Sequence, residues 1–134
     1  MIDVGKKPVN EREAKARGLI TMTASTIELI KKNKIPKGNV LESSRIAGIL
    51  SVKNVPHIIP LCHPINITWA DVSFQLKDSG VEIQSWVKGI DRTGVEMEAL
   101  TAVAIAALTI YDMCKGVDKN IKIENIQLIE KKKE

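Results

Sequence analysis

An uncharged run between Glu98 and Asp112 is the clearest pattern in the chain. Its alanines are spread around the helical circumference instead of forming one stripe, which is typical of a helix that packs on most sides. Thr93 and Glu96 have the spacing of a capping box, so the helix is expected to begin there and to end at Gly116. The run is too short to cross a bilayer, which takes about 20 residues. The pattern predicts a central core helix.

Four other segments have the composition or the alternation of β-strands. They are residues 12–22, 65–76, 81–90 and 121–129. The four residues from Lys77 to Gly80 predict a hairpin between the second and third segments. The apolar positions of the second segment change faces near Trp69, which predicts a bulge or an exchange of faces there.

Two helices are expected between the first and second strands. Thr23 or Ser25 is expected to cap the first, with Glu28 at the capping-box spacing from Ser25. Asn39, with Glu42 three residues later, predicts the start of the second helix, which is expected to continue to about residue 53. A turn at residues 36–38, where proline precedes lysine and glycine, separates the two helices.

The order of these elements predicts an α+β fold. With one helix set aside as additional, it is the β-α-β-β-α-β order of a ferredoxin-like sandwich, an antiparallel sheet with helices on one face. A single domain over residues 1–134 is expected, with flexible N-terminal residues and a flexible, solvated lysine-rich tail at residues 130–134. Trp69 and Trp86 are candidates for the uncovered sheet face, which another subunit is expected to cover.

Composition narrows the class of protein. Hydrophobic residues make up 44% and charged residues 27% of the chain. The formal net charge is +4, part of which lies in the lysine-rich tail, and the remaining excess is compatible with a small anionic ligand without indicating one. The N-terminus lacks the apolar core of a signal peptide, and the two cysteines have no zinc-binding or disulfide spacing, so a reduced, cytoplasmic protein is expected. Motifs for an organic cofactor or an iron–sulfur cluster are absent from the sequence.

The ends of the uncharged helix carry candidate chemistry. Asp112 stands near the helix C-terminus, where a carboxylate faces unpaired carbonyls and requires a compensating partner. Lys115, three residues later on the same face, can be a structural partner, or the two can present a rigid acid/base pair. Lys37 lies before a helix N-terminus, where it has the wrong sign for the dipole; it is either a solvated loop lysine or half of an anion site.

A second candidate lies between Pro60 and Pro64. These prolines are expected to hold Leu61, Cys62 and His63 in a stiff, extended segment. Adjacent residues of such a segment point to opposite sides, which argues against a Cys-His nucleophile pair. A lone histidine and cysteine also make a poor metal site. His63 is expected either to bind a ligand or neighbouring carboxylate or to be structural.

Several motifs together resemble one known family. They are K-G-N-V at 37–40, R-I-A-G-I at 45–49, I-P-L-C-H-P at 59–64, T-G-V-E-M-E-A-L-T-A at 93–102 and A-L-T-I-Y-D-M-C-K at 107–115. In this order they closely resemble the molybdenum-cofactor biosynthesis protein C (MoaC) family, the cyclic pyranopterin monophosphate synthases. One departure lies at Asp91-Arg92, where many members have Gly-Lys; Arg92 keeps the positive charge without the compact ammonium.

The resemblance implies an enzyme, a phosphorus–oxygen lyase. Its substrate would be a GTP whose C8 has been joined to its 3′ carbon, rearranged to cyclic pyranopterin monophosphate with release of pyrophosphate. It also implies a homo-oligomer, a hexamer built as a trimer of dimers, with active sites between subunits. The catalytic residues implied are Asp112, Lys37 and Lys115. The substrate-binding residues implied are Leu61, Cys62, His63, Glu96, Met97, Glu98, Lys53 and Arg92.

Neither a metal site nor an organic cofactor is expected, although Mg²⁺ can accompany the substrate phosphates without a protein cage. No membrane or nucleic-acid partner is expected. An RNA-binding module of this fold needs aromatic platforms on its strands, and the chain has few aromatic residues. A catalytically silent ligand sensor is the second alternative, since one fold can serve many functions.

Overall fold

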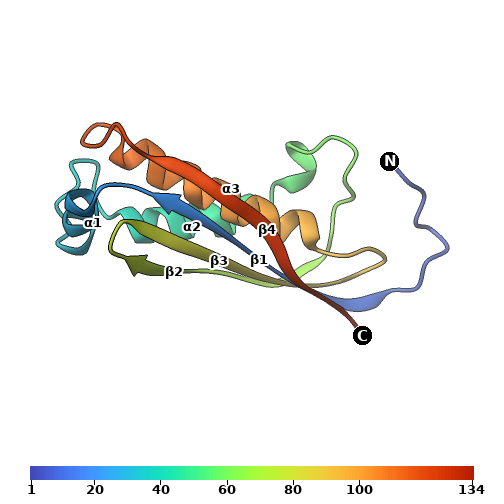
Figure 1. Cartoon of the computed structure of the whole chain (residues 1–134). Coiled ribbons are helices and arrows are strands. Elements are labelled where there is room, and N and C mark those ends of the chain that lie inside the picture. Colours follow the sequence, from blue (N-terminus) through green and yellow to red (C-terminus); the bar gives the residue numbers. More distant parts are fainter.

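The computed structural model describes residues 1–134, and its elements follow the predicted order. They are β1 (Asn10–Thr21), α1 (Ala24–Lys31), α2 (Val40–Val52), the 3-10 helix η1 (Val55–His57), β2 (Ile67–Lys77), β3 (Gly80–Asp91), α3 (Glu96–Cys114) and β4 (Lys122–Lys133). The strands form one antiparallel sheet in the order β2-β3-β1-β4, with α2 and α3 along one face (Figure 1). The predicted ferredoxin-like α+β fold is confirmed.

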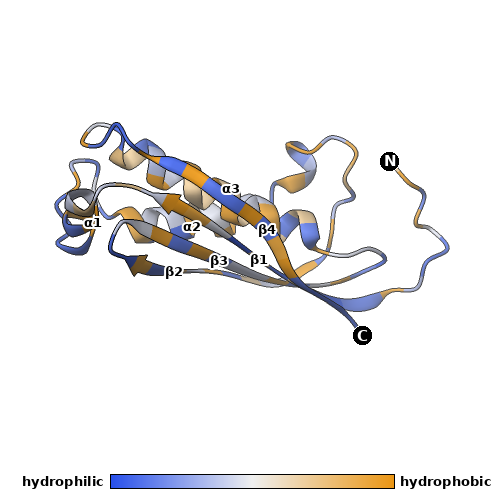
Figure 2. Ribbon diagram, viewed as in Figure 1, coloured by the Kyte–Doolittle hydropathy of each residue, from blue (hydrophilic) through white to orange (hydrophobic).

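The core lies between the sheet and the two long helices. Every second residue of β1 and β3 is buried, so hydrophobic and hydrophilic residues alternate along the strands (Figure 2). The inward side chains, among them Ile20, Ile83 and Val87, meet the buried alanines of α3. The length and composition of α3 alone would suit a membrane span. In this fold α3 is instead the central core helix that its composition predicted.

Helix α2 lies close against α3 because a glycine stands at their contact. A Cβ added at Gly48 would lie 3.0 Å from the Ala102 carbonyl oxygen of α3 and 3.0 Å from Val72 Cγ2 of β2. Any larger residue would therefore push α2 away from both elements. The predicted bulge near Trp69 is present as a shift in the β2–β3 register between Ile67 and Trp69.

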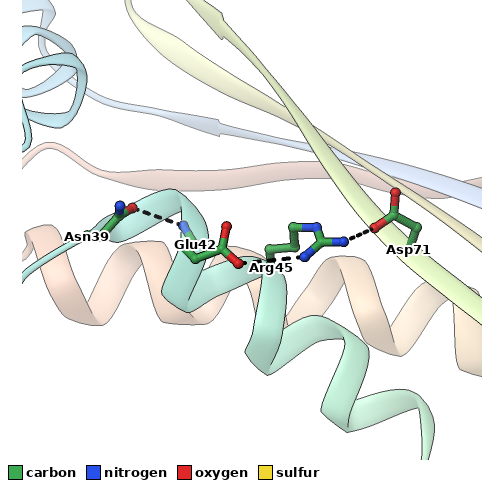
Figure 3. Close-up of polar contacts among 4 residues, drawn as sticks. All are labelled: Asn39, Glu42, Arg45 and Asp71. Carbon is green, nitrogen blue, oxygen red and sulfur yellow. Dashed lines mark hydrogen bonds and ion pairs between the residues drawn. The ribbon is translucent and has the colours of Figure 1, made fainter.

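Polar contacts fix the start of α2 (Figure 3). The Asn39 side chain accepts a hydrogen bond from the Glu42 amide at 3.1 Å, so the predicted cap is confirmed. Arg45 on the next turn lies 3.6 Å from Glu42 and donates to Asp71 Oδ1 on β2 at 2.9 Å. These bonds tie the first turn of α2 to the sheet edge, and with it the end of the loop that carries Lys37.

Two other predicted capping boxes are wrong. Helix α3 begins at Glu96 with Val95 in the N-cap position, so Thr93 does not cap it. For α1, the Ser25–Glu28 box is not formed, and the alternative candidate Thr23 occupies the N-cap position. The Thr23 hydroxyl bonds to Thr26 and to the distant Asp118 instead of a helix amide. A hydroxyl near a helix start can bond either to a helix amide or to a group distant in the sequence. In α1 the distant carboxylate of Asp118 is the partner.

The expectation of a flexible C-terminal tail at residues 130–134 is also corrected. Strand β4 continues through these residues and pairs with β1, with Lys133 opposite Arg12, and the Glu134 amide donates to the Glu11 carbonyl at 3.0 Å. The backbone of β1 offers its hydrogen-bonding groups regardless of side-chain charge, while the lysine side chains extend to solvent. Composition alone therefore missed the strand.

The sheet face opposite the helices carries the two tryptophans. Their rings meet edge to face with centroids 5.0 Å apart, and the Trp86 indole N–H donates to Glu13. The ammonium groups of Lys15 and Lys88 lie 4.3 and 4.8 Å from the Trp86 ring centroid, within cation–π range. Both rings are thus on the uncovered face, as expected. Its coverage by another subunit stays a prediction.

Candidate functional site

The C-terminal end of α3 carries a three-residue ion cluster, which we call the basic end. Lys37 Nζ lies 2.9 Å from Asp112 Oδ2, and Lys115 Nζ lies 3.2 Å from Asp112 Oδ1. Each carboxylate oxygen therefore holds one ammonium group. The three side chains are each about half exposed, so all of them are open to a ligand.

Local backbone geometry sets the position of Lys37. Gly38 adopts a φ of +117°, which a side chain would disfavour, and its amide closes a turn to the Ile35 carbonyl at 3.0 Å. The Asn39 cap then starts α2. The Asn39 side chain accepts a hydrogen bond from the Glu42 amide. The Lys37 ammonium donates to Asp112. The turn directs the lysine towards the end of α3.

The two lysines determine the protonation state of Asp112. The hydrogen bond from Lys37, and then the one from Lys115, hold the pKa of this carboxyl below its ordinary value. Asp112 is consequently a carboxylate at neutral pH. The pairing with Lys115 was predicted from their spacing, whereas the pairing with Lys37 joins residues that no local pattern connects.

A buried carboxylate stands behind the basic end. Asp118, in the loop after α3, accepts hydrogen bonds from the Thr23 amide at 2.9 Å, the Thr26 hydroxyl at 2.7 Å and the Asn120 amide at 2.7 Å. Burial opposes its ionisation, yet these donors hold the pKa of Asp118 below its ordinary value. Asp118 thus fixes the chain after Lys115 to the start of α1.

The N-terminal end of α3 is different, and we call it the acidic end. Glu98 is only 1% exposed, and burial raises its pKa to about 7. A hydrogen bond from its own backbone amide opposes this rise, and the like charges of Glu96 and Asp91 add to it. Glu96 Oε1 is buried and has no hydrogen-bond partner. Lys131 Nζ of β4 lies 3.9 Å from it. Sequence reasoning missed Lys131 because it treated that segment as a tail.

The loop that carries Leu61, Cys62 and His63 faces the acidic end. Burial, and then the charge of Glu98, raise the pKa of the Cys62 thiol. The loop does not run fully extended, since the Cys62 amide bonds to the Ile59 carbonyl at 3.4 Å in a turn. The expected stiff extended segment is therefore corrected: the turn precedes His63. Leu61 is 69% exposed and points away from the core.

Arg92 lies beside this end and is held through its backbone. Arg12, nearly buried on β1, donates to the Asp91 carbonyl at 3.3 Å and to the Arg92 carbonyl at 3.1 Å. Although burial opposes it, the amides of Asn66 and Arg92 lower the pKa of Asp91. The Nε atom of Arg92 is buried and has no hydrogen-bond partner. An unsatisfied cationic donor of this kind suits an anionic ligand group.

Lys53 stands between the end of α2 and the start of η1. It is exposed at the C-cap of α2, and it lines a hollow of about 330 Å³ together with Ile49, Ile67 and Trp69. Met97, the remaining candidate, is partly exposed in the first turn of α3. No group of three or more His, Cys, Asp or Glu side chains is arranged to hold a metal ion.

The structure therefore gathers the candidates into two groups, at opposite ends of one helix (Figure 1). Lys37, Asp112 and Lys115 meet at the basic end, near α1, and most of the others meet at the acidic end, near η1. From Glu96 to Lys115 the helix rises about 28 Å, at 1.5 Å per residue. Within one chain the two groups do not form one pocket.

Comparison with known proteins identifies the family of this chain. The MoaC family model matches residues 1–134. A cyclic pyranopterin monophosphate synthase of Chloroflexus aggregans is 52% identical, with 98% of this chain and 81% of the relative covered. One from Thermoanaerobacter sp. (strain X514) is 50% identical, with 98% and 84% covered. A molybdenum cofactor biosynthesis bifunctional protein of Chlorobaculum tepidum is 49% identical, with 96% and 41% covered. The chain belongs to the MoaC family.

Proposed function

We propose that this protein is a cyclic pyranopterin monophosphate synthase, a lyase of molybdenum cofactor biosynthesis. It rearranges the cyclised GTP described above into the tricyclic pterin, closes a cyclic phosphate and releases pyrophosphate. The observation that carries the proposal is the cluster of Lys37, Asp112 and Lys115, in which one carboxylate holds two exposed ammonium groups. Two oriented cations are suited to a substrate that carries three phosphates.

The cationic residues bind the phosphates in this proposal. Lys37 and Lys115 can each exchange a contact with Asp112 for a phosphate oxygen, because all three side chains are half exposed. Lys53 and Arg92 supply further positive charge, the latter through its unsatisfied Nε. As pyrophosphate leaves, negative charge develops on its oxygens, and cations already in position stabilise that charge.

The carboxyl groups at the two ends of α3 have different roles in this proposal. Asp112 stays ionised and has a lowered pKa, so it orients the lysines and serves poorly as a base. Lys37 and Lys115 donate and accept protons, and Glu98, with a pKa of about 7, is the carboxyl best poised to do so at neutral pH. Glu96 accepts from the N–H groups of the guanine-derived ring. Leu61, Cys62, His63 and Met97 line that part of the site.

The active site lies between subunits of a homo-oligomer in this proposal, a hexamer arranged as a trimer of dimers. The separation of the two ends of α3 supports it. A ligand pocket of about 1,000 Å³ is on the order of 12 Å across, whereas the ends are about 28 Å apart along the helix. Both groups can contact one substrate only if different copies supply them.

The setting of the reaction is proposed from the family. Mg²⁺ can accompany the substrate phosphates, since it is commonly held by phosphates and one or two carboxylates. The protein acts in the cytoplasm on a small nucleotide-derived molecule, without a nucleic-acid or membrane partner. It has no organic cofactor of its own in this proposal: proton transfers assist the opening of the imidazole ring and its closure as a pterin, and closure of the cyclic phosphate displaces pyrophosphate.

The test uses the cyclised GTP intermediate, generated in situ by the upstream radical enzyme. Release of pyrophosphate and formation of an oxidisable, fluorescent pterin are followed for the native protein and for Lys37→Ala. Lys77→Ala is the matched control, since Lys77 also forms an exposed ion pair, 3.6 Å from Glu82. The proposal is supported if the native protein and the control form both products and Lys37→Ala forms neither. If the native protein binds the intermediate without converting it, the protein is a ligand sensor and the proposal is wrong.

A further inference from the structure

The basic end is accompanied by four exposed lysines to which the proposed function gives no role. We call them the lysine rim. They are Lys32 and Lys34, which follow α1, and Lys119 and Lys122, which follow α3. Figure 1 shows the loop after α3 beside α1, and a hydrogen bond from the N-cap residue of α1 to Asp118 joins the two. The rim lysines therefore lie at the same end of the molecule as the basic end.

The chain leaves the charge of the lysine rim uncompensated. None of its four lysines forms an ion pair within the chain. The carboxylates of the same segments are already engaged: Glu28 lies 3.4 Å from Lys31, and Asp118 is buried among hydrogen-bond donors. Asp112 is shared by the two lysines of the basic end. The rim ammonium groups are thus available to an anion.

The excess charge of the whole chain is concentrated at this end. Residues 23–39 and 112–122 together contain seven lysines and three carboxylates, a net charge of +4. The formal net charge of the whole chain is also +4, so the remaining residues, the lysine-rich tail included, sum to zero. A field of one sign at one end of a molecule attracts ligands of the opposite sign to that end.

The basic end alone has little positive charge for a triphosphate. Lys37 and Lys115 against the ionised Asp112 leave one net positive charge. The helix dipole places about half a negative charge at the C-terminus of α3, which opposes an anion. A triphosphate carries roughly four negative charges at neutral pH. The further cations of the proposed site, Lys53 and Arg92, are accompanied there by the glutamates of the acidic end, so additional cations are required.

Backbone contacts place two rim lysines close to those of the basic end. The Lys34 amide donates to the Leu29 carbonyl at 2.8 Å, which closes the end of α1. The Cα atoms of Lys34 and Lys37 are at most about 11 Å apart, three residues along the chain. The Lys119 ammonium donates to the Lys115 carbonyl at 3.4 Å and so offsets the negative end of the α3 dipole. Charges within about 10 Å act together on an anion at about 0.1 M salt.

We propose that the lysine rim is an outer polyphosphate site, which makes binding depend on the number of phosphates that a ligand carries. The attraction between the rim and a ligand grows with the charge of the ligand, so a triphosphate gains more from the rim than a monophosphate does. Capture of polyphosphate is argued from the charge and geometry of the rim. Only the statement that the captured ligand is the cyclised GTP rests on the proposed function.

Calorimetric titration with inorganic tripolyphosphate tests the rim without turnover, and orthophosphate is titrated at the same ionic strength. The double variant Lys34→Glu, Lys119→Glu is expected to raise the dissociation constant of tripolyphosphate about tenfold or more in about 0.1 M salt, and that of orthophosphate at most about twofold. The double variant Lys34→Arg, Lys119→Arg keeps both charges and is the matched control, with native affinity expected.

A second control separates the rim from net charge. Lys6→Glu, Lys7→Glu makes the same change in net charge in the N-terminal segment, which lies at the opposite end from α1 (Figure 1). It should leave tripolyphosphate binding unchanged, and an equal loss of affinity would overturn the proposal. Native-like tripolyphosphate binding by Lys34→Glu, Lys119→Glu would overturn it too, as would equal affinity of the native protein for the two anions.

Turnover of the cyclised GTP intermediate distinguishes this proposal from the proposed function. In Lys34→Glu, Lys119→Glu, KM should rise about tenfold while kcat stays within about twofold, because the rim lysines act on binding alone. A large fall in kcat at an unchanged KM would contradict the rim. If the native protein binds tripolyphosphate through the rim but does not convert the intermediate, the proposed function is wrong and the rim stands. If it converts the intermediate and the rim variants bind normally, only the rim is wrong.

Discussion

The two ends of α3 place charge in opposite ways. At the basic end, Lys37, Asp112 and Lys115 are half exposed and mutually paired, and the two lysines hold the pKa of Asp112 below its ordinary value. At the acidic end, Glu98 is buried without a cation, and its pKa rises to about 7. The same helix therefore carries an ionised, exposed carboxylate between two lysines at one end and a buried carboxyl near its titration point at the other. The first arrangement suits phosphate binding, and the second suits proton transfer.

The two ends of α3 also differ in how much their charged residues contribute to folding stability. Exposed ion pairs contribute on the order of 0–1 kcal/mol to folding, so the basic end can be rebuilt at little structural cost. A buried, uncompensated carboxyl opposes folding once it ionises. Residues of the two ends should accordingly respond differently to mutation and to pH.

The largest effect is expected at the basic end. Asp112→Ala releases both lysines from their positions, and turnover should fall by about a thousandfold, on the order of 4 kcal/mol in activation free energy. Thermal unfolding should change little, because the lost pairs are exposed. Pyrophosphate release and a melting curve measure the two quantities. Glu82→Ala, which removes another exposed ion pair, is the control; near-native turnover of Asp112→Ala would exclude the carboxylate from the mechanism.

The next effect concerns Glu98 and pH. Its folded-state pKa of about 7 lies above the ordinary value of 4.5, so between these values the folded protein keeps a proton that the unfolded chain releases. Stability from this group is present below pH 4.5 and is lost as the pH rises through 7, by about 3 kcal/mol in total. Glu98→Gln should lack this loss. Urea unfolding of both proteins from pH 4.5 to 8 measures it, and parallel curves would contradict the buried, uncompensated state.

Asp118 should give an intermediate effect of a structural kind. Asp118→Ala leaves the Thr23 amide and the Thr26 hydroxyl without their acceptor, and unfolding free energy should fall by about 2 kcal/mol. Because Asp118 holds the chain after Lys115, kcat should fall more than KM changes. Asp118→Asn keeps one acceptor oxygen and should recover part of both. An unchanged kcat in a destabilised Asp118→Ala protein would limit Asp118 to folding.

The smallest effect is expected for Leu61. It is 69% exposed and contributes little to the core, so Leu61→Ala should alter unfolding free energy by less than about 0.5 kcal/mol. If Leu61 contacts the substrate, KM should still rise about fivefold, or roughly 1 kcal/mol. Ile58→Ala, an exposed neighbour in the same loop, is the control. Equal KM values for the two variants would remove Leu61 from the site.

The features that the sequence predicted correctly depend on residues close together in the chain. Strand alternation, the Asn39 cap, the hairpin, the bulge near Trp69 and the pairing of Asp112 with Lys115 all depend on residues a few positions apart, and all are present. Periodicity carries that information directly.

What the sequence missed depends on distant partners. Lys37 meets Asp112, and Thr23 meets Asp118, only after the fold brings α1 to the end of α3. The strand at residues 130–133 forms because β1 offers a free edge, which no property of the lysine-rich segment indicates. The resemblance implied active sites between subunits, but no sequence pattern showed that the candidate residues gather at two opposite ends of α3. That separation is a consequence of helix length.

Complementation between two inactive variants tests the central claim, that each site joins the two ends of α3 from different copies. Asp112→Ala has an altered basic end, and His63→Ala has an altered acidic end. The two are coexpressed with different tags, purified through both tags and assayed for pyrophosphate release. Neither variant alone should turn over. Random mixing of copies should restore about a quarter of native activity, because an intact site needs the acidic end of an Asp112→Ala copy and the basic end of a His63→Ala copy. A mixed oligomer without activity would contradict the shared site.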